Sequence, residues 1–206
     1  MTASASMSPL EGAVRVRVVA IGASAGGIGG LLQLLPDLPT IANCALLIVV
    51  HLYPSSKSLL PDILRRSAQR GPGHWKVKQA EEGETLHPGI AYIAAPDFHL
   101  VLSGDQLHLS STAPVRLHRP SVDVLFASVA KERGAGAIAV LLSGAGRDGS
   151  DGLRLMKMSG ASTIVQDPAE AAFPSMPEHG IQTGCADFIM PTQSIAPQIS
   201  MLCAQG

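Results

Sequence analysis

The chain has 206 residues, of which 46% are hydrophobic and 15% charged, so it can bury a sizeable core and is expected to form one domain. Its formal net charge of -1 and its aromatic content of 3% argue against nucleic-acid binding, which needs a basic surface and, for single strands, stacking side chains. No apolar run reaches the roughly 18 residues that span a bilayer, and no signal peptide is recognisable, so we expect a cytoplasmic protein without direct membrane insertion.

Residues 1–13 are small and polar and predict a flexible N-terminal leader before a domain over residues 14–206. From Val14, short β-branched segments alternate with helical patterns, which is typical of a sheet with helices on both faces. The first half predicts, in order, strand Val14–Ile21, helix Ile28–Leu35 ending at Pro36, strand Ala45–Leu52, helix Ser58–Gln69 with Pro61 in its first turn, and strand Trp75–Ala80.

In the middle of the chain, His99–Leu102 and Gln106–Leu109 flank Ser103-Gly104-Asp105, the pattern of an antiparallel hairpin, and Ile90–Ala94 is a candidate for the same ribbon. The second half predicts helix Val122–Arg133, strand Ala137–Leu142, helix Gly152–Met158, strand Ser162–Gln166, helix Met176–Thr183, strand Asp187–Met190 and a C-terminal helix. These elements predict an α/β fold: a doubly wound, mostly parallel sheet flanked by helices on both faces, with a small antiparallel hairpin insertion near the middle.

The most informative segment ends the first predicted strand. Val18–Ile21 is followed by Gly22-Ala23-Ser24-Ala25-Gly26, and this Gly-x-Ser-x-Gly spacing is typical of a serine held on a tight turn between strand and helix. The glycines relieve crowding, and the N–H groups that begin the next helix can bind an oxyanion. Ser24 is therefore a candidate nucleophile, although a serine in such a turn is more often a helix N-cap.

Two further polar residues follow apolar strands. His51 comes directly after Leu46–Val50, and Asp148 follows Ala137–Leu142 through a glycine-rich loop. Because ligands bind at the carboxyl ends of parallel strands, Ser24, His51 and Asp148 are expected at one edge of the sheet. A hydroxyl, an imidazole and a carboxylate are the groups of a hydrolytic triad. Taken alone, however, a histidine after an apolar run is more often a core residue.

The residues alone leave one choice in this triad open. Either Asp148 or Asp151 can complete it, and the other is expected to cap the helix that begins near Gly152. The remaining histidines lack the spacing of metal ligands, and we interpret them as surface or loop residues: His74, His87, His99, His108, His118 and His179. The cysteines, odd in number and without a Cys-x-x-Cys pair, predict reduced buried thiols and suggest neither a disulfide framework nor a zinc site: Cys44, Cys185 and Cys203. We expect no metal and no cofactor.

A nucleotide-binding alternative comes from the same glycine-rich turn, which is similar to the cofactor loop of short-chain dehydrogenases. Tyr53 and Lys57 even supply a Tyr-x-x-x-Lys pair. The glycine spacing differs by one residue, however, and Pro54 disfavours the helix that such a pair needs. His51 stands where an acidic residue would bind a ribose hydroxyl, and no Lys-Ser/Thr follows the glycines as in a Walker loop. An NAD(P)-dependent oxidoreductase is therefore the less favoured prediction.

In combination, the motifs resemble the CheB-type chemotaxis protein-glutamate methylesterases from about Val18 to Met190. The segments that carry the resemblance are Ile21–Gly27, Val49–His51, Glu81–Gly83, Pro88–Ala94, Arg119–Phe126, Leu142–Gly149 and Met176-Pro177. The resemblance implies that Ser24 is the nucleophile, His51 the general base and Asp148 the orienting carboxylate, and that Asp151 is the helix cap. It also implies hydrolysis of glutamyl methyl esters, and often deamidation of glutamines, on the cytoplasmic helices of methyl-accepting chemoreceptors or related signalling proteins.

Further site residues follow from that resemblance. The backbone N–H groups of Ala25 and Gly26, or of the Ala145 turn, are candidate oxyanion donors. Arg119 and Met176 are expected to wall the pocket, the arginine meeting an acidic receptor surface and the thioether packing on the stem of the ester. A solvated arginine and a core methionine remain the alternatives. For the whole protein, the alternative is a non-catalytic methylesterase-like module that binds methylated helices.

The sequence departs from the better-known members of that family at Ala25, Ala145 and Val50, where threonine, methionine and glutamine, respectively, are common. These departures bear on the support of His51, on substrate preference and on rate, and they leave the triad intact. Familiar members also carry an N-terminal phosphoacceptor receiver domain, for which residues 1–13 are too few. We therefore expect any phosphorylation control to come from a regulatory protein in trans.

Overall fold

The computed structural model describes residues 15–51 and 59–204. Several sequence predictions lie outside the described residues: the leader 1–13, the strand ends Val14 and Leu52, the helix start Ser58 and the Tyr53/Lys57 pair. Within the described part of the chain, no helix has the length and apolar character needed to cross a membrane.

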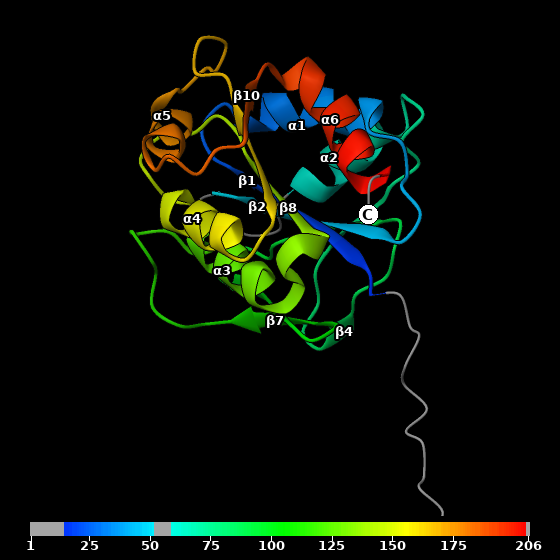
Figure 1. The fold of residues 1–206 in the computed structure, drawn as a ribbon. Helices are drawn as coiled ribbons and strands as arrows, with labels where there is room; N and C mark the ends of the chain where they lie inside the picture. The colour runs from blue at the N-terminus through cyan, green and yellow to red at the C-terminus, as the bar shows by residue number, and fades with distance from the viewer. Residues whose placement is uncertain (1–14, 52–58, 205–206) are drawn as a thin grey trace, which may run out of the picture.

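A sheet of parallel strands forms the centre of the molecule (Figure 1). From edge to edge its strands are β10 (Phe188–Met190), β9 (Ser162–Gln166), β8 (Ala137–Leu141), β1 (Arg17–Ala23), β2 (Cys44–Val50), β5 (Ile90–Ile93) and β3 (Lys76–Gln79). Every residue of β2 and β8 is buried, so these strands read as continuous apolar runs without alternation. That pattern is expected when helices cover both faces of a parallel sheet.

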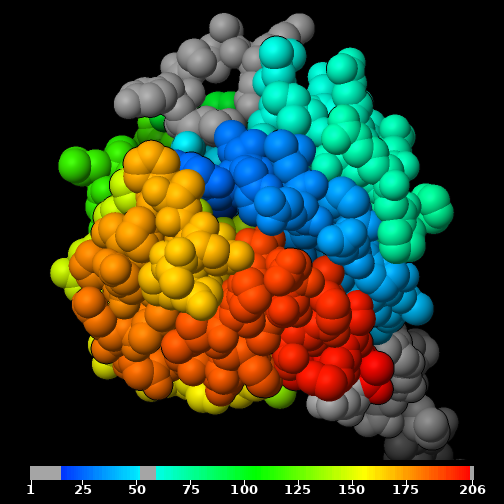
Figure 2. Space-filling model, turned by 90° about the horizontal axis from the view of Figure 1, so that it is seen from above, coloured from blue at the N-terminus to red at the C-terminus, as the bar shows by residue number. Residues whose placement is uncertain are grey.

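The helices divide between the two faces. On one face lie α1 (Gly27–Asp37), α2 (Leu60–Ala68) and α6 (Thr192–Ala204), with α1 between the other two (Figure 2). On the other face lie α3 (Val122–Arg133), the short η1 (Gly134–Gly136), α4 (Ser150–Met158) and α5 (Ser175–Gln182). A second, antiparallel sheet of β4 (Glu84–Thr85), β7 (Gln106–Ser110) and β6 (His99–Ser103) packs on α3.

The predicted α/β class with a small antiparallel insertion is confirmed, but the assignment of Ile90–Ala94 to the ribbon is wrong. β5 pairs in parallel with both β2 and β3 inside the main sheet. Ala91, Tyr92 and Ile93 are all buried, and only a strand covered on both faces can bury successive residues. The third strand of the ribbon is instead β4, which the sequence analysis missed.

The first helix continues past the predicted stop at Pro36 and ends at Asp37. Proline lacks an N–H group, so in the last turn of a helix it leaves the carbonyl four residues earlier, here Leu32, without its helical donor. The hydroxyl of Ser67, from α2, donates to that carbonyl at 2.9 Å. A side chain of α2 thus provides the hydrogen bond that the Leu32 carbonyl lacks because of Pro36, and α1 can include this proline.

Candidate active site

Ser24 lies on a tight turn between β1, which ends at Ala23, and α1, which begins at Gly27. The turn requires Gly26, whose φ is 76° and whose added Cβ would lie 2.7 Å from the Cβ of Ala172. β1 is also where the sheet reverses its winding, with β2 on one side and β8 on the other. Ligand sites of doubly wound sheets lie at the carboxyl ends of strands at this switch point.

Parallel pairing brings Ser24 and His51 next to each other. β1 and β2 pair in register up to Ala23 and Val50, and the N–H of His51 donates to the carbonyl of Ala23 at 3.2 Å. Ser24 and His51 are each one residue beyond that last pair, on strands about 4.8 Å apart. The juxtaposition therefore follows from the sheet itself and does not depend on a long loop.

Asp148 reaches the same place from the loop after β8. Its Oδ2 lies 2.7 Å from Nε2 of His51, and both side chains are nearly inaccessible to solvent. The carboxylate also sits at the N-terminus of α3, where free N–H groups and the helix dipole favour a negative charge. Its further donors are Ser121 Oγ at 2.8 Å and the N–H groups of Val122 at 2.7 Å, Asp123 at 3.1 Å and Gly149 at 3.1 Å.

These contacts keep Asp148 ionised despite its burial. Burial alone would raise the pKa of the carboxyl, but the hydrogen bonds from His51 and from the N–H groups of Val122 and Asp123 outweigh it and lower that pKa to about 2. At neutral pH the site therefore presents His51 with a fixed negative charge, which favours the ring bearing its proton on Nε2.

The other ring nitrogen of His51, Nδ1, is buried and has no hydrogen-bond partner among the described residues. Because Nε2 is engaged by Asp148, Nδ1 is the nitrogen left to accept a proton. Within residues 15–51 and 59–204, no hydrogen bond joins Ser24 Oγ to His51. Apo hydrogen bonds of this kind are often long and tighten only when substrate binds.

Two turns near Ser24 carry backbone N–H groups that are candidate oxyanion donors. The carbonyl of Ala25 accepts from Ser143 Oγ at 3.0 Å, so the N–H of Gly26, in the same planar peptide, points the opposite way. The carbonyl of Gly144 accepts from the N–H of Met176 at 2.9 Å, which likewise turns the N–H of Ala145 away from α5. The three candidate oxyanion donors, Ala25, Gly26 and Ala145, find no acceptor within the described chain.

A histidine that we interpreted as a surface residue stacks on His51. The rings of His51 and His118 lie 3.7 Å apart between centroids and within 5° of parallel. His118 is presented by a tight turn, since Val115 and His118 pair with each other and Arg116 and Leu117 between them have φ of 50° and 69°. Burial, and then the neighbouring charge of His51, lower the pKa of His118. The side chain of Leu117 is 96% exposed at the tip of this turn.

Arg119 and Met176, the expected pocket walls, have well-defined partners. The guanidinium of Arg119 donates to Oδ1 of Asp97, at 2.6 and 2.9 Å, and to the carbonyls of Ser111 and Thr112, so it braces the segment that carries His118. Met176 is completely buried, with its sulfur against Gly144. An added Cβ on Gly144 would lie 2.1 Å from that sulfur and 2.8 Å from the Cβ of Ser24, so Met176 lies directly behind the Ser24 turn.

The predicted cap role of Asp151 is wrong. α4 begins at Ser150, and its N-cap residue is Gly149, whose φ of 94° favours glycine and which has no side chain that could cap the helix. The carboxylate that accepts from the first turn is that of Asp123 on α3, which bonds the N–H of Gly152 at 2.8 Å. Asp151 instead forms an ion pair with Arg116. A cap supplied by another helix cannot be read from local sequence.

Two serines and one further histidine were also missed. Ser121 caps α3 and donates to Asp148, and a serine directly before a predicted helix is a signal that was available. Ser143 fixes both Ala25 and Phe173 through its hydroxyl. His99 is completely buried, accepting from the N–H of Ser121 at 3.2 Å, so its interpretation as a surface residue is wrong. Nothing local marks His99, Ser143 or His118, because their partners are distant in sequence.

No group of three or more His, Cys, Asp or Glu side chains in the described part of the chain is arranged to hold a metal ion. The arrangement around Ser24 is thus one of hydroxyl, imidazole, carboxylate and backbone N–H groups. Such a set can perform acyl transfer, in which a hydroxyl attacks a carbonyl and N–H groups stabilise the oxyanion.

Comparison with known proteins identifies relatives over nearly all of this domain. A family model described as CheB methylesterase matches residues 19–199. A protein-glutamate methylesterase/protein-glutamine glutaminase of Photorhabdus laumondii is 43% identical over 178 residues, which cover 84% of this chain and 49% of that protein. Its namesake in Escherichia coli K12 is 38% identical over 187 residues, which cover 89% of this chain and 52% of that protein. The chain thus spans about half the length of these curated relatives.

Among solved structures, the catalytic domain of the Thermotoga maritima CheB methylesterase superimposes with a TM-score of 0.84 at 30% sequence identity. The match covers 94% of this chain and 100% of that domain. The region shared with the longer relatives is therefore the region that forms the fold described above.

Proposed function

The chain belongs to the CheB methylesterase family, and from that premise we propose that it is a serine hydrolase that demethylates glutamyl methyl esters. The relatives' names also include protein-glutamine glutaminase, and we extend the proposal to deamidation of glutamines. The substrates would be helices in the cytoplasmic part of chemoreceptors or of related signalling proteins. Both reactions pass through a tetrahedral oxyanion, so one site can serve both.

In this mechanism Ser24 Oγ attacks the ester carbonyl while Nδ1 of His51 accepts the serine proton. The imidazolium so formed is stabilised by Asp148, which stays ionised at neutral pH because its pKa is about 2. His51 then donates the proton to the departing methoxide, and methanol leaves an acyl-enzyme. Water, activated by His51, attacks that ester, and Ser24 leaves with its proton restored as the glutamate carboxylate is released.

The N–H groups of Ala25, Gly26 and Ala145 are the proposed oxyanion donors. Their directions are set by carbonyls already bonded to Ser143 and Met176, so they need no reorganisation when charge develops. Arg119 is the proposed contact for acidic receptor surface, although its bonds to Asp97 must then be shared or exchanged. Met176 would act on the ester pocket only through Gly144, because its own side chain is buried.

One observation supports this proposal more than any other. Ser24 and His51 lie side by side at the ends of adjacent strands, and His51 Nε2 lies 2.7 Å from an Asp148 carboxylate that α3 holds ionised. These groups are far apart in sequence, yet they meet at the switch point of the sheet, where catalytic groups of such folds gather.

The test is methanol release from methylated chemoreceptor fragments by the purified chain. Ser24→Ala and His51→Ala should each retain less than about 1% of the wild-type rate, because a serine without its base is a poor nucleophile. Ser194→Ala, on α6, is the matched control and should keep full activity. A fluorophosphonate probe should label wild type at Ser24 and leave Ser24→Ala unlabelled.

Two results would contradict the proposal. Methanol release by Ser24→Ala above about one part in a hundred would exclude Ser24 as nucleophile. Wild-type protein that binds methylated receptor fragments but neither releases methanol nor reacts with the probe would identify a non-catalytic binding module.

A further inference from the structure

Arg17, Cys44 and Cys203 lie together at the amino ends of β1 and β2, whereas the candidate active site lies at the carboxyl ends of these strands. Arg17 and Cys44 are register partners at the first positions of β1 and β2, so their side chains project from the same face. That is the face covered by α1 and α6, as the shared core of Cys44, Leu46 and Ile48 indicates. Cys203, in the last turn of α6, packs against this core.

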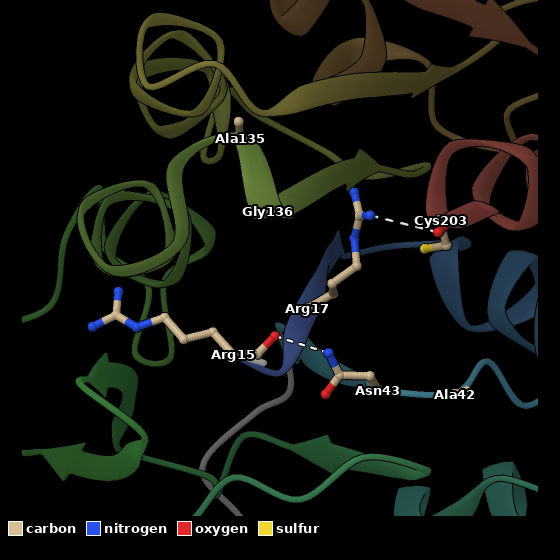
Figure 3. A pocket seen from close by; sticks show the side chains of 7 residues that line it. All are labelled: Arg15, Arg17, Ala42, Asn43, Ala135, Gly136 and Cys203. Carbon is tan, nitrogen blue, oxygen red and sulfur yellow. Dashed lines mark hydrogen bonds between the residues drawn. The ribbon is translucent and has the colours of Figure 1, made fainter. Parts of the chain in front are cut away.

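An open pocket is lined in part by Cys203. Its volume is about 450 Å³, and its lining includes Arg15, Arg17, Asn43 and Cys203 (Figure 3). In Figure 3 the side chain of Arg17 extends toward Cys203, whereas that of Arg15 points away. Cys203 is half-buried and borders the pocket, while Cys44 is completely buried and does not line it. A small solute can therefore reach one thiol but not the other.

Arg17 is oriented as a counter-ion for this pair. Its Nη1 donates to the Cys203 carbonyl at 3.5 Å, a long contact, and its buried Nε has no partner among the described residues. A buried guanidinium N–H without an acceptor is costly, and a thiolate nearby would relieve that cost. Hydrogen bonding with the Cys44 side chain, and then the charge of Arg17, lower the pKa of the Cys203 thiol to about 7 against the opposing effect of burial. The pKa of Cys44 is raised, chiefly by its interaction with Cys203 and by burial.

We propose that Cys203 and Cys44 form a reversible dithiol–disulfide pair, in which Cys203 is the thiol that reacts with hydroperoxides and Cys44 is the thiol that resolves it. The contact of the Cys44 thiol with the carbonyl of Ala45 is long, at 3.7 Å, so little is lost when the Cys44 sulfur bonds Cys203. The disulfide joins the start of β2 to the end of α6. This site goes beyond the proposed esterase, and it differs from the inert buried thiols expected from sequence.

The chemistry balances with a hydroperoxide as the named oxidant. The Cys203 thiolate attacks one peroxide oxygen, the O–O bond breaks, and the alkoxide or hydroxide that leaves takes up a proton, which gives a sulfenic acid at Cys203. Cys44 then attacks that sulfur, the S–O bond breaks, and the hydroxide leaves as water with the Cys44 proton. Two thiols are oxidised, one peroxide is reduced, and a dithiol reductant reverses the change.

The first experiment treats the full chain, as the Ser24→Ala variant, with hydrogen peroxide. Using this variant separates the outcome from esterase activity, so either proposal can fail without the other. Titratable thiols should fall from three to one, and mass spectrometry should find a peptide linked between Cys44 and Cys203 that dithiothreitol cleaves. Cys185 is the internal control and should stay free. Cys44→Ser should stop at a sulfenic acid on Cys203, trapped by dimedone.

The second experiment measures iodoacetamide alkylation as a function of pH. Cys203 should react half-maximally near pH 7 and at least about tenfold faster than Cys185 at pH 7. Arg17→Gln, which leaves both thiols in place, should shift the Cys203 midpoint upward. Retention of all three thiols in peroxide, a link that includes Cys185, or a midpoint unchanged by Arg17→Gln would each overturn the proposal.

Discussion

At the scale of single residues, His51 is held on its edge by Asp148 and on its face by His118. The edge contact fixes the tautomer, and the parallel stack restrains the plane of the ring. Because burial and the neighbouring His51 lower the pKa of His118, the stacking ring is neutral near pH 7 and does not add a second positive charge when His51 becomes protonated. His118 is therefore a positioning residue for the proposed base.

Replacement of His118 tests this positioning role. His118→Ala should lower kcat for methanol release by about tenfold with little change in KM, because His51 loses its stacking face while substrate contacts remain. His118→Phe restores an aromatic face and should recover most of the loss. Equal activity in wild type and His118→Ala, or equal loss in the Ala and Phe variants, would show that stacking does not matter.

A comparison of Asp148→Asn with Asp151→Asn distinguishes the two aspartates that the sequence could not separate. Asp148→Asn should lower kcat by about 10³-fold or more, since the amide can present its NH₂ to His51 and favour the wrong tautomer. It should also destabilise the fold by about 1–2 kcal/mol, because α3 loses the charge at its N-terminus. Asp151→Asn removes only an exposed ion pair with Arg116 and should change kcat less than twofold. Steady-state kinetics and urea unfolding measure both effects.

The sequence predicts the core of the site because Ser24, His51 and Asp148 each follow an apolar strand, and parallel strands end at one edge. It could not predict His118, because the contact depends on the left-handed backbone of Arg116 and Leu117 and on ion pairs of Arg116 with α3 and α4. Residue type and spacing identify groups that a strand positions. They do not identify a group such as His118, which a turn distant in sequence brings into contact with the site.

At the scale of elements, α1 shows how a helix can include a proline near its end, with Ser67 replacing the missing donor to Leu32. Ser67→Ala should destabilise the protein by about 1 kcal/mol in urea unfolding, since it leaves a part-buried carbonyl unsatisfied. In a Pro36→Ala background the restored N–H can bond Leu32, so the same substitution should cost less than half as much. Equal costs in both backgrounds would refute this explanation.

Most elements were predictable because long apolar runs and 3.6-residue patterns are local signals. The failure at β5 has a physical cause. Ile90–Ile93 is followed at once by the hairpin of β6 and β7, and its four residues fit an antiparallel ribbon as well as a parallel sheet. The parallel pairing is decided by the burial of Tyr92 and its neighbours on both faces, which depends on residues distant in sequence, such as Leu100 and Leu107 beside Tyr92.

At the scale of the whole molecule, all strands of the main sheet run in the same direction, so the carboxyl ends and the amino ends of the strands carry different chemical groups. Every strand of the main sheet places its carboxyl end on the side of Ser24 and His51, and its amino end on the side of Arg17 and Cys44. The proposed ester hydrolysis and the proposed thiol chemistry are therefore separated by the length of the strands.

The pH dependence of folding stability should reflect a buried pair of carboxyls, Asp123 and Asp148, at the start of α3. Burial, reinforced by the charge of Asp148, raises the pKa of Asp123 to about 6 in the folded protein, against about 4 in an unfolded chain. Because its pKa is raised, Asp123 stays protonated to a higher pH in the folded state than in the unfolded chain. The contribution of Asp123 to the free energy of unfolding is therefore greatest below pH 4, and it decreases between about pH 4 and 6.

Asp123→Asn removes this titration while keeping a carbonyl that can accept from Gly152. Relative to wild type, the variant should gain roughly 1–3 kcal/mol between pH 4 and pH 7 in urea unfolding, because only wild type loses stability over that window. Below pH 4 the two curves should run parallel, since the depressed pKa of Asp148 costs both proteins stability as the pH falls toward 2. Asp62→Asn, at an exposed carboxylate on α2, is the matched control. If the difference between Asp123→Asn and wild type stays constant from pH 4 to 7, Asp123 titrates alike in the folded and unfolded states, and its burial between α3 and α4 does not disfavour its charge.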